Sequence, residues 1–484
     1  MKRRVTFVTL FMLLCTFAAV SQTFQWNYLG LFPPAGLAKG DTIWPADIHG
    51  LAVDPDGKIW VQRLGTNTRD TILIPNYLIQ KDTTHAISPD SVIARQTAVR
   101  AIYVYNPNGT QAAFSPIFFA KGGGISDTIG GASTYVKGVK VWHPSISPNS
   151  GRGLRADNNG NIIVTSFGTL YRLNYKTGAA MNKAVVDPAN SGVAVGVSNA
   201  GYVYANNVVA GGTPLKIYNP DLSFFGNAVD TLTSFSRAID VSNDGNDIYF
   251  SGYTNHAVYR YHSDLGVLGS YLTRVDTILK GFDCESYCWN PKTHLLYLSS
   301  GSFNDFSNQW PGLTTHYDTA AWYAYNPTTN TVGDKINWVF WGTTNVLKAN
   351  ERPRAIAFSP GGDTAYVGVF GGSAPTPGLR VYRRVQTSIE PVPGGVPTAY
   401  ALTQNYPNPF NPTTEIQFTV AKAGMTTLKV FDILGREVAT LVNQPMNPGK
   451  FKVSFDGKNL SSGSYIYVLT SGDARITKKM MLLK

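Results

Sequence analysis

Six residues at equivalent positions of an internal repeat are the candidates for chemistry in this sequence. Each begins a small apolar segment that is followed by a tight polar turn, and they are His49, Arg152, Val193, Arg237, Glu285 and Arg354. Three of the six are arginines and only one is acidic, so the set would repel a divalent cation. Guanidinium groups instead bind anionic or hydroxyl-rich partners. We therefore expect the five members other than Val193 to bind an anionic or carbohydrate ligand, without a metal ion or a cofactor.

A structural role is the alternative for the same residues. Glu285 could form a salt-bridge network with one or two neighbouring arginines, and such a network needs no further function. One glutamate cannot neutralise three arginines, however, which favours a bound anion. The residue types leave both interpretations open.

Support for catalysis is weaker. His49 and Glu285 could approach each other as a base and an acid, but nothing in the sequence sets the distance between them. The sequence contains neither a Gly-x-Ser-x-Gly elbow nor a phosphate loop. We assign no catalytic residue and no metal ligand.

The elements that must position these residues are the strands of the repeat, which occurs six times. The copies occupy residues 49–61, 152–164, 193–205, 237–250, 285–298 and 354–368. Turn pairs such as Asp56-Gly57 and Asn159-Gly160 are typical of two-residue hairpins. An alternating third segment and a less regular fourth segment follow most copies, and four antiparallel strands per unit are typical of a propeller blade. The sequence predicts an all-β, six-bladed β-propeller over residues 22–384.

The sixth copy ends without a fourth strand, after residue 384. Residues 24–32 (FQWNYLGLF) have the pattern of that missing strand. Pairing the two ends of the domain would close the ring and leave no open sheet edge. We therefore expect the N-terminal strand to complete the last blade.

The ring residues start the innermost strands, so they should surround one mouth of a central channel. Long connections at 64–98, 121–151, 300–320 and 341–353 are expected on the same face, where binding sites are usually built. They carry a set of side chains suited to stacking on sugars: Trp142, His143, Trp310, His316, Tyr317 and Trp341. Each of these could equally hold its own loop in place.

The repeats resemble those of six-bladed propellers of the NHL and gluconolactonase-like group, over roughly residues 24–384. The resemblance is one of architecture, and such propellers include lactonases, lyases and binding modules, so it leaves function open. In gluconolactonase-like enzymes the ring position supplies carboxylate and amide ligands to a divalent metal. The three arginines at that position here argue against a metal-dependent lactonase.

A second domain is expected at residues 399–484, after a Pro/Gly linker at 385–398. Its alternating segments predict a small antiparallel β-sandwich. The motifs are Pro407-Asn408-Pro409-Phe410, Asp432-Ile433-Leu434-Gly435, residues 460–465 (LSSGSY) and Lys478-Lys479. They resemble the type A sorting domain of type IX secretion, which is similar to the immunoglobulin-like domain of flagellar hook-capping proteins. This resemblance implies the type IX machinery as a partner and a location outside a Gram-negative cell or on its surface.

The remaining features set limits on other functions. The formal net charge is +11, but much of the excess lies in the tail and the signal segment, which does not indicate a nucleic-acid partner. No segment after residue 21 is long and apolar enough to be a transmembrane helix. We expect a secreted or cell-surface binding module with its ligand at the loop-rich mouth. The alternatives are an extracellular carbohydrate or lactone lyase or hydrolase, and a structural surface or filament subunit.

Residues 1–21 have the pattern of a cleaved signal peptide, and this gives the first prediction. Lys2, Arg3 and Arg4 precede an apolar run, and Ala19-Val20-Ser21 offers small residues for cleavage. The mature protein should therefore begin at Gln22, within one or two residues. N-terminal peptide mapping of exported protein tests this, and recovery of residues 1–20 would contradict it.

Overall fold

The computed structural model describes residues 22–34, 48–63, 70–73, 96–99, 101–131, 134–136, 139–141, 146–148, 151–188, 190–193, 195–208, 212–234, 236–252, 255–300, 321–338, 352–370, 379–392 and 397–484. Apart from one 3-10 turn, η2 (Gly266–Leu268), the elements in these ranges are β-strands. The chain divides into two compact units: residues 26–385, and residues 386–484 together with the segment that ends at Gln25. Each unit is described separately.

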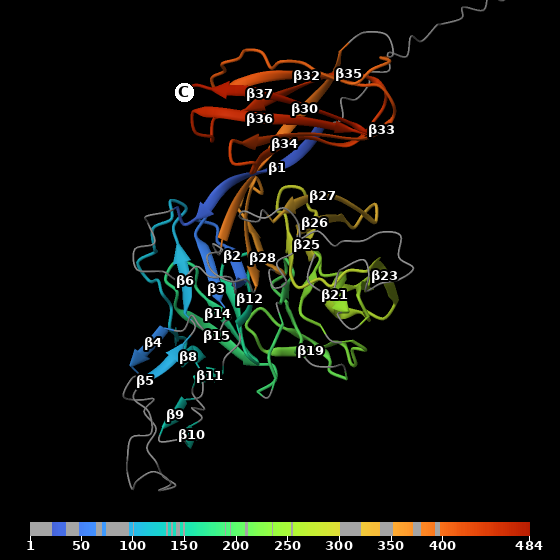
Figure 1. Ribbon diagram of the computed structural model, residues 1–484. Helices are drawn as coiled ribbons and strands as arrows, with labels where there is room; N and C mark the ends of the chain where they lie inside the picture. The colour runs from blue at the N-terminus through green and yellow to red at the C-terminus, as the bar shows by residue number, and fades with distance from the viewer. Residues whose placement is uncertain are drawn as a thin grey trace, which may run out of the picture. The chain divides into compact units, whose positions relative to one another are not determined.

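In the described part of the first unit, six sheets, the blades, follow one another along the chain (Figure 1). Blade 1 comprises β2 (Ile48–Val53), β3 (Ile59–Arg63) and β6 (Ile102–Tyr105). Blade 2 comprises β12 (Gly151–Ala156), β13 (Ile162–Ser166), β14 (Thr169–Leu173) and β15 (Ala180–Val185). Blade 3 comprises β16 (Gly196–Val197), β17 (Val203–Ala205), β18 (Leu215–Tyr218) and β19 (Phe224–Val229).

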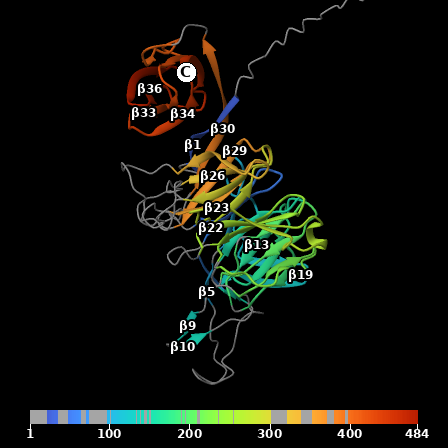
Figure 2. The ribbon, with the colours of Figure 1, turned by 90° about the vertical axis from the view of Figure 1, so that its right-hand side faces the viewer.

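The other three blades repeat this order. Blade 4 comprises β20 (Ile239–Val241), β21 (Asp247–Gly252), β22 (Ala257–His262) and β23 (Arg274–Lys280). Blade 5 comprises β24 (Tyr287–Trp289), β25 (Leu296–Ser300), β26 (Ala321–Asn326) and β27 (Thr331–Asn337). Blade 6 comprises β28 (Arg352–Phe358), β29 (Thr364–Phe370), the first part of β30 (Leu379–Val392) and β1 (Gln22–Phe32), and Figure 2 shows β29 and β30 running beside each other.

Blade 1 differs from the expected pattern in its last strand. A fourth strand was expected after β6, but in the described structure two isolated bridges, Ile102 to Ile117 and Tyr105 to Gln111, join the following segment to β6. The next strand, β7 (Phe119–Gly122), pairs instead with β8 (Ile125–Gly131), which also pairs with β11 (Ile146–Pro148). Two further hairpins are β4 (Asp70–Leu73) with β5 (Gln96–Val99) and β9 (Thr134–Val136) with β10 (Val139–Val141).

The innermost strands form a closed cycle. Each of β2, β12, β16, β20, β24 and β28 contacts the next, and β28 contacts β2 again. The buried apolar side chains follow the same order, because each of six clusters joins two neighbouring blades. The last of these packs Ile48 and Leu51 of blade 1 on Ala355 and Tyr366 of blade 6. The core is therefore a ring of interblade layers, which requires every blade to be apolar on both faces.

The hairpin between the first two strands of a blade is held by its own polar residues. The Asp54 Oδ1 atom accepts hydrogen bonds from the backbone N–H groups of Asp56 and Lys58, at 3.0 and 2.9 Å. The Asp157 Oδ1 atom accepts the equivalent pair from Asn159 and Asn161, both at 2.9 Å. This is the side-chain-to-backbone bonding expected of aspartate in a turn. Blades 1 and 2 therefore share the same turn because an aspartate begins it in both.

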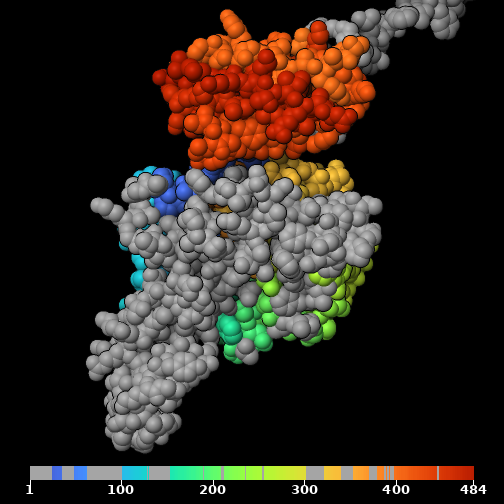
Figure 3. All heavy atoms as spheres, viewed as in Figure 1, coloured from blue at the N-terminus to red at the C-terminus, as the bar shows by residue number. Residues whose placement is uncertain are grey.

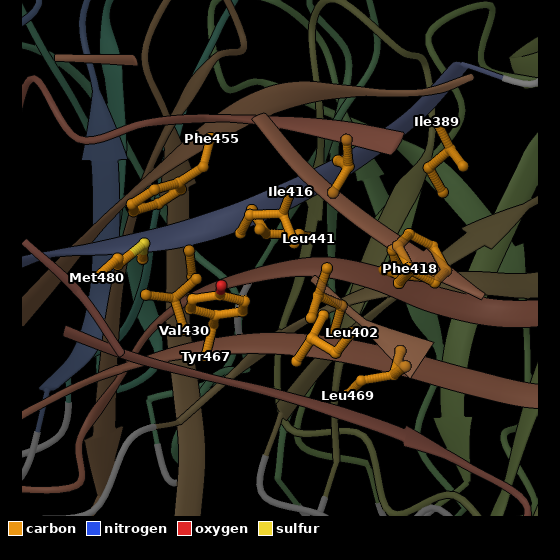
Figure 4. Packing of buried hydrophobic residues seen from close by; sticks show 14 of the residues in the cluster. Ile389, Leu402, Ile416, Phe418, Val430, Leu441, Phe455, Tyr467, Leu469 and Met480 are labelled. Atoms are coloured by element: carbon orange, nitrogen blue, oxygen red, sulfur yellow. The ribbon is translucent and has the colours of Figure 1, made fainter. Parts of the chain in front are cut away.

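The second unit is a two-layered β-sandwich. One sheet contains β31 (Ala401–Leu402), β32 (Thr413–Val420), β35 (Gly449–Asp456) and the end of β30, and the other contains β34 (Glu437–Met446), β33 (Gly424–Asp432), β36 (Gly463–Ser471) and β37 (Ala474–Leu482). Their facing side chains, including Ile416 and Phe418 from one sheet and Val430, Tyr467 and Leu469 from the other, form one buried cluster (Figure 4). On the face shown in Figure 3, the orange and red atoms of this unit form a continuous surface.

These observations confirm the predicted fold class, an all-β six-bladed propeller followed by a small immunoglobulin-like β-sandwich. The N-terminal strand β1 pairs with β30. Strand β30 also continues to Val392, inside the segment expected as a linker, and its residues Ile389–Val392 pair with β35. A Pro/Gly composition did not prevent strand pairing there, because Pro391 lies near the end of the strand, where a missing N–H group is tolerated.

Gly160 gives a test of the contact between the first two blades. Its φ is +84°, and a Cβ atom there would lie 2.3 Å from Cγ of Pro55 in the turn of blade 1. Gly124 has a similar φ of +78° with nothing within 4 Å, so it serves as a matched control. Both Gly→Ala substitutions should cost about 1 kcal/mol in backbone strain, and Gly160→Ala should cost about 1–3 kcal/mol more from the clash.

Urea unfolding followed by tryptophan fluorescence measures this difference. All nine tryptophans precede residue 342, so the signal reports on the propeller and not on the sandwich. Equal destabilisation by the two substitutions would show that the turns of blades 1 and 2 are not in tight contact.

Candidate functional site

Glu285 lies between two arginines from the blades on either side of it. Its Oε1 atom is 3.2 Å from Nη1 of Arg237, and its Oε2 atom contacts Nε of Arg354. The Glu285 backbone N–H donates to Oγ of Ser299 at 3.0 Å, which holds the start of this inner strand in place. The structure thus brings three of the five predicted ligand-binding residues together from blades 4, 5 and 6.

The three side chains differ in their exposure to solvent. The side chain of Glu285 is 1% exposed and that of Arg354 is 4% exposed, whereas that of Arg237 is 20% exposed. A buried carboxylate needs a charged partner, because an isolated one would pay a large desolvation cost. Arg354 provides the buried partner, and Arg237 is the member of this cluster that solvent reaches. The network that the structural interpretation expected is present.

The other predicted residues are less fully described. His49 is a buried residue of β2, and Arg152 lies in β12 with its side chain outside the described part of the structure. The inner strands have β-bulges next to His49, Arg152 and Arg354, and bulges commonly redirect a side chain. The loop residues Trp142, His143, Trp310, His316, Tyr317 and Trp341 lie outside the described ranges. Ligand binding by this set stays a prediction.

Arg155 of blade 2, which the sequence analysis did not select, crosses the axis of the propeller. Its Nη2 atom is 2.8 Å from Oδ2 of Asp240 in blade 4 and donates to the backbone carbonyl of Tyr287 in blade 5 at 2.7 Å. Its Nε atom is 3.4 Å from the carbonyl of Val195 in blade 3. One guanidinium group therefore ties together four of the six blades.

Burial shifts the pKa values of Asp240 and of the nearby Cys288. Burial raises the pKa of the Asp240 carboxyl to about 6, although the Arg155 guanidinium acts in the opposite direction. Asp240 is therefore ionised at neutral pH and paired with Arg155. Burial also raises the pKa of the Cys288 thiol to about 11, so this thiol stays protonated at neutral pH. A protonated thiol is a poor nucleophile.

A cavity of about 450 Å³ lies on one side of the Arg155–Asp240 pair. This side carries the hairpin turns between the first and second strands of the blades, and we call it the hairpin side. All six blades contribute to its lining, which places it on the axis. Its inner part includes Arg155, Asp240, Cys288, Trp289 and Phe358. One residue from the hairpin turn of each blade contributes to the rim: Pro55, Asn158, Asn199, Asn243, Pro291 and Pro360.

The rim has two chemically different halves. Blades 5, 6 and 1 are neighbours and contribute prolines, whereas blades 2, 3 and 4 are neighbours and contribute asparagines. Hydrogen bonds join adjacent turns: Asn158 Nδ2 donates to the Asn199 carbonyl, and the Asn199 N–H donates to the Asn243 carbonyl at 2.8 Å. A polar wall therefore faces an apolar wall across the rim, and these hydrogen bonds connect the turns of the polar wall.

The aligned repeats contained a signal for this second site. Three residues after the ring position the six copies read Ala52, Arg155, Gly196, Asp240, Cys288 and Ala357. Residues at equivalent positions of the repeats lie at the same level, that is, at the same position along the axis of the ring. An arginine and an aspartate at one level are candidates for an ion pair across the channel. At this position blade 3 has Gly196, where a Cβ atom would lie 2.8 Å from the backbone nitrogen of Val241 in blade 4. A glycine here therefore lets blades 3 and 4 approach closely. These residues lie three positions along the chain from the residues that were predicted to bind a ligand, and none of them was predicted as a site residue.

Comparison with known proteins identifies the carboxyl-terminal unit. Residues 404–483 match the family model of the "Secretion system C-terminal sorting domain". The carboxyl-terminal unit is therefore a sorting domain, as its motifs predicted. This domain implies recognition by the type IX secretion machinery and a location at the cell surface or outside the cell. No curated protein matches the sequence.

Two solved structures are similar to the chain at low identity. A crystal structure of a mitotic checkpoint complex has a TM-score of 0.39 and 10% identity, and the match covers 70% of this chain and 89% of that one. The Swd1 β-propeller domain from Myceliophteria thermophila has a TM-score of 0.36 and 8% identity, with 71% and 98% covered. The fold assignment rests on the sheets and their closed order. Membership of the NHL and gluconolactonase-like group stays a prediction.

Metal-ligand clusters and membrane-spanning helices are both absent from the described residues. No group of three or more His, Cys, Asp or Glu side chains lies together there as a metal ion would require. No helix in the same ranges is long and apolar enough to cross a membrane.

The unequal burial of the two arginines beside Glu285 gives a stability prediction. Arg354→Ala should cost about 3–5 kcal/mol, because it removes the buried partner of a buried carboxylate. Arg237→Ala should cost about 1 kcal/mol, because Arg237 is partly solvated and Arg354 remains. Arg274→Ala is the control, since Arg274 is 57% exposed in its ion pair with Asp276 and should change stability by no more than about 0.5 kcal/mol.

The free energy of unfolding in urea, measured by tryptophan fluorescence, compares the three variants. Equal losses for Arg237→Ala and Arg354→Ala would contradict the assignment of Arg354 as the main partner of Glu285.

Proposed function

We propose that this protein is an extracellular binding module, in which the sorting domain delivers a propeller that holds a ligand on its axis. The single observation that carries the proposal is the axial cavity, lined by residues of all six blades. Its volume is in the range of about 300–1,000 Å³ that ligand sites occupy. Concave, preformed sites with a few polar groups are the usual form of a small-molecule site.

The charged groups along the axis favour binding over catalysis. Asp240 is paired with Arg155, and Glu285 is paired with Arg237 and Arg354. Their described contacts join blades to one another, as expected of groups that stabilise a ring. A general acid or base must instead be free to exchange a proton with a substrate. The loop-rich mouth remains a second location for ligand binding. The residues predicted to bind a ligand there are His49, Arg152, Arg237, Glu285 and Arg354.

Export places this function outside the cell. We propose that a signal peptide directs the chain to the periplasm of a Gram-negative bacterium, and that the type IX machinery then moves it to the outer surface or the medium. The match of residues 404–483 to the sorting domain supports this route. A rigid propeller is suited to such a location, because its six interblade layers provide stability without disulfides.

A localisation and binding experiment tests the proposal. The full-length exported protein should be found at the surface or in the medium, and deletion of residues 398–484 should retain it in the periplasm. A thermal-shift screen of metabolites and glycans on exported protein should find compounds that raise Tm without being consumed. Surface delivery of the deletion variant would contradict the sorting role. Turnover of a glycan or lactone would support the enzyme alternative, and an absence of any stabilising compound, together with self-assembly, would support a structural subunit.

A further inference from the structure

We infer that the hairpin-side cavity binds a neutral, hydroxyl-rich ring, the size of one or two sugar units. This inference deepens the proposed function and rests on it. It differs in location from the anionic or carbohydrate ligand expected at the other mouth, and it specifies a neutral ligand. The cavity lies beyond the Arg155–Asp240 pair, at the ends of the inner strands opposite to Glu285.

The shape of the cavity favours a compact ligand. Six hairpin turns surround it, and the Arg155 side chain crosses the axis at its inner end. A chain that runs through the site would need two openings, whereas a single ring or the terminal unit of a longer chain needs one. A volume of about 450 Å³ accommodates a ligand of one or two rings.

The charges in the lining favour a neutral ligand. Arg155 is accompanied in the lining by three carboxylates, those of Asp54, Asp157 and Asp240. The lining therefore has no excess of positive charge to attract an anion. These carboxylates already accept hydrogen bonds or ion pairs, from the turn backbone in the first two and from Arg155 in the third. Each carboxylate also has a basic side chain beside it: Lys58 at 3.9 Å from Asp54, Arg172 at 3.3 Å from Asp157 and Arg155 at 2.8 Å from Asp240. These three carboxylates are therefore charge-balanced and offer little attraction to a cationic ligand.

The polar wall offers groups that hydrogen-bond to hydroxyls. Asn158, Asn199 and Asn243 are exposed on neighbouring turns, and each side-chain amide can both donate and accept. Ser198 also lines the cavity, is 3% exposed, and its Oγ atom has no hydrogen-bond partner among the described residues. A buried hydroxyl without a partner carries an energetic cost, and a ligand hydroxyl would remove it.

The opposite wall offers apolar surface. Pro55, Pro291 and Pro360 lie on the three adjacent turns, with Trp289 and Phe358 beneath them in the lining. The Trp289 indole is held by its Nε1 atom, which donates to the Val241 carbonyl at 2.8 Å. A sugar ring presents C–H groups on its faces and hydroxyls at its edge, so it matches a site with one apolar wall and one amide wall. A loop tip of a protein would match the amides as well, and the experiment treats it as a competing outcome.

The test uses the full-length mature protein and simple sugars as probes. Saturation-transfer NMR and calorimetry should detect binding of glucose, galactose, mannose or N-acetylglucosamine, or of their dimers. The matched charged sugars, glucuronate and glucosamine, should bind more weakly than glucose. The double variant Asn199→Ala/Asn243→Ala should weaken binding at least about tenfold, from the loss of two or more hydrogen bonds. Asn227→Ala, an exposed asparagine of the outer strand β19, should have no effect.

The outcomes separate this inference from the proposed function. Urea midpoints equal to wild type would show that the asparagine variants remain folded. Stronger binding of glucuronate than of glucose, or binding unaffected by the double variant, would overturn the inference. Binding that depends on Arg237 but not on Asn199 and Asn243 would overturn it while leaving the proposed function intact. A peptide that binds in an asparagine-dependent way, with no sugar binding, would overturn the ligand class. No binding by any probe or screened compound would overturn both.

Discussion

The ion pair between Arg155 and Asp240 is the interaction on which the axis of this propeller depends. Neighbouring blades are held by apolar layers, but this pair joins blades that are not neighbours, and the same guanidinium reaches the Tyr287 carbonyl of a further blade. A buried ion pair adds little net stability, because desolvation offsets the attraction. We expect its stronger effect to be on specificity, because separating the two groups would leave a buried charge without a partner. It also separates the cavity on the hairpin side from the rest of the channel.

The hairpin turns serve both folding and the proposed function. A polar residue begins each turn and, in Asp54 and Asp157, accepts backbone N–H groups that would otherwise lack partners. The next residue in each turn is then placed on the rim of the cavity. That residue is free to vary, because proline and asparagine both suit the position after the polar residue that begins the turn. The difference between the two halves of the rim therefore has little consequence for the fold, and we expect it to reflect the ligand.

The sorting domain uses its motifs in a similar, largely structural way. The Asp432 Oδ1 atom accepts the N–H groups of Leu434 and Arg436, at 2.9 and 3.0 Å, so the turn motif is a side-chain-stabilised hairpin. Ile433 and Leu434 at the tip of this turn are exposed, whereas the strands on either side bury their apolar residues in the sandwich core. The domain has its own core, which is consistent with its role as a separable export signal.

The sequence by itself was enough to determine the class of fold and the sorting tail, because both depend on local patterns. Turn acids and glycines specify hairpins, alternation specifies strands, and six repeats of this pattern specify the number of blades. Alignment of the repeats also brought Arg237, Glu285 and Arg354 to one level of the ring, where the structure joins them. Alignment gives the level of a residue along the axis but not how far its side chain reaches across the channel. Only the tertiary structure decided that Arg155 meets Asp240, 85 positions along the chain, and that a cavity remains beyond them. The reach of a long side chain depends on the width of the closed ring, and no local pattern in the sequence encodes that width.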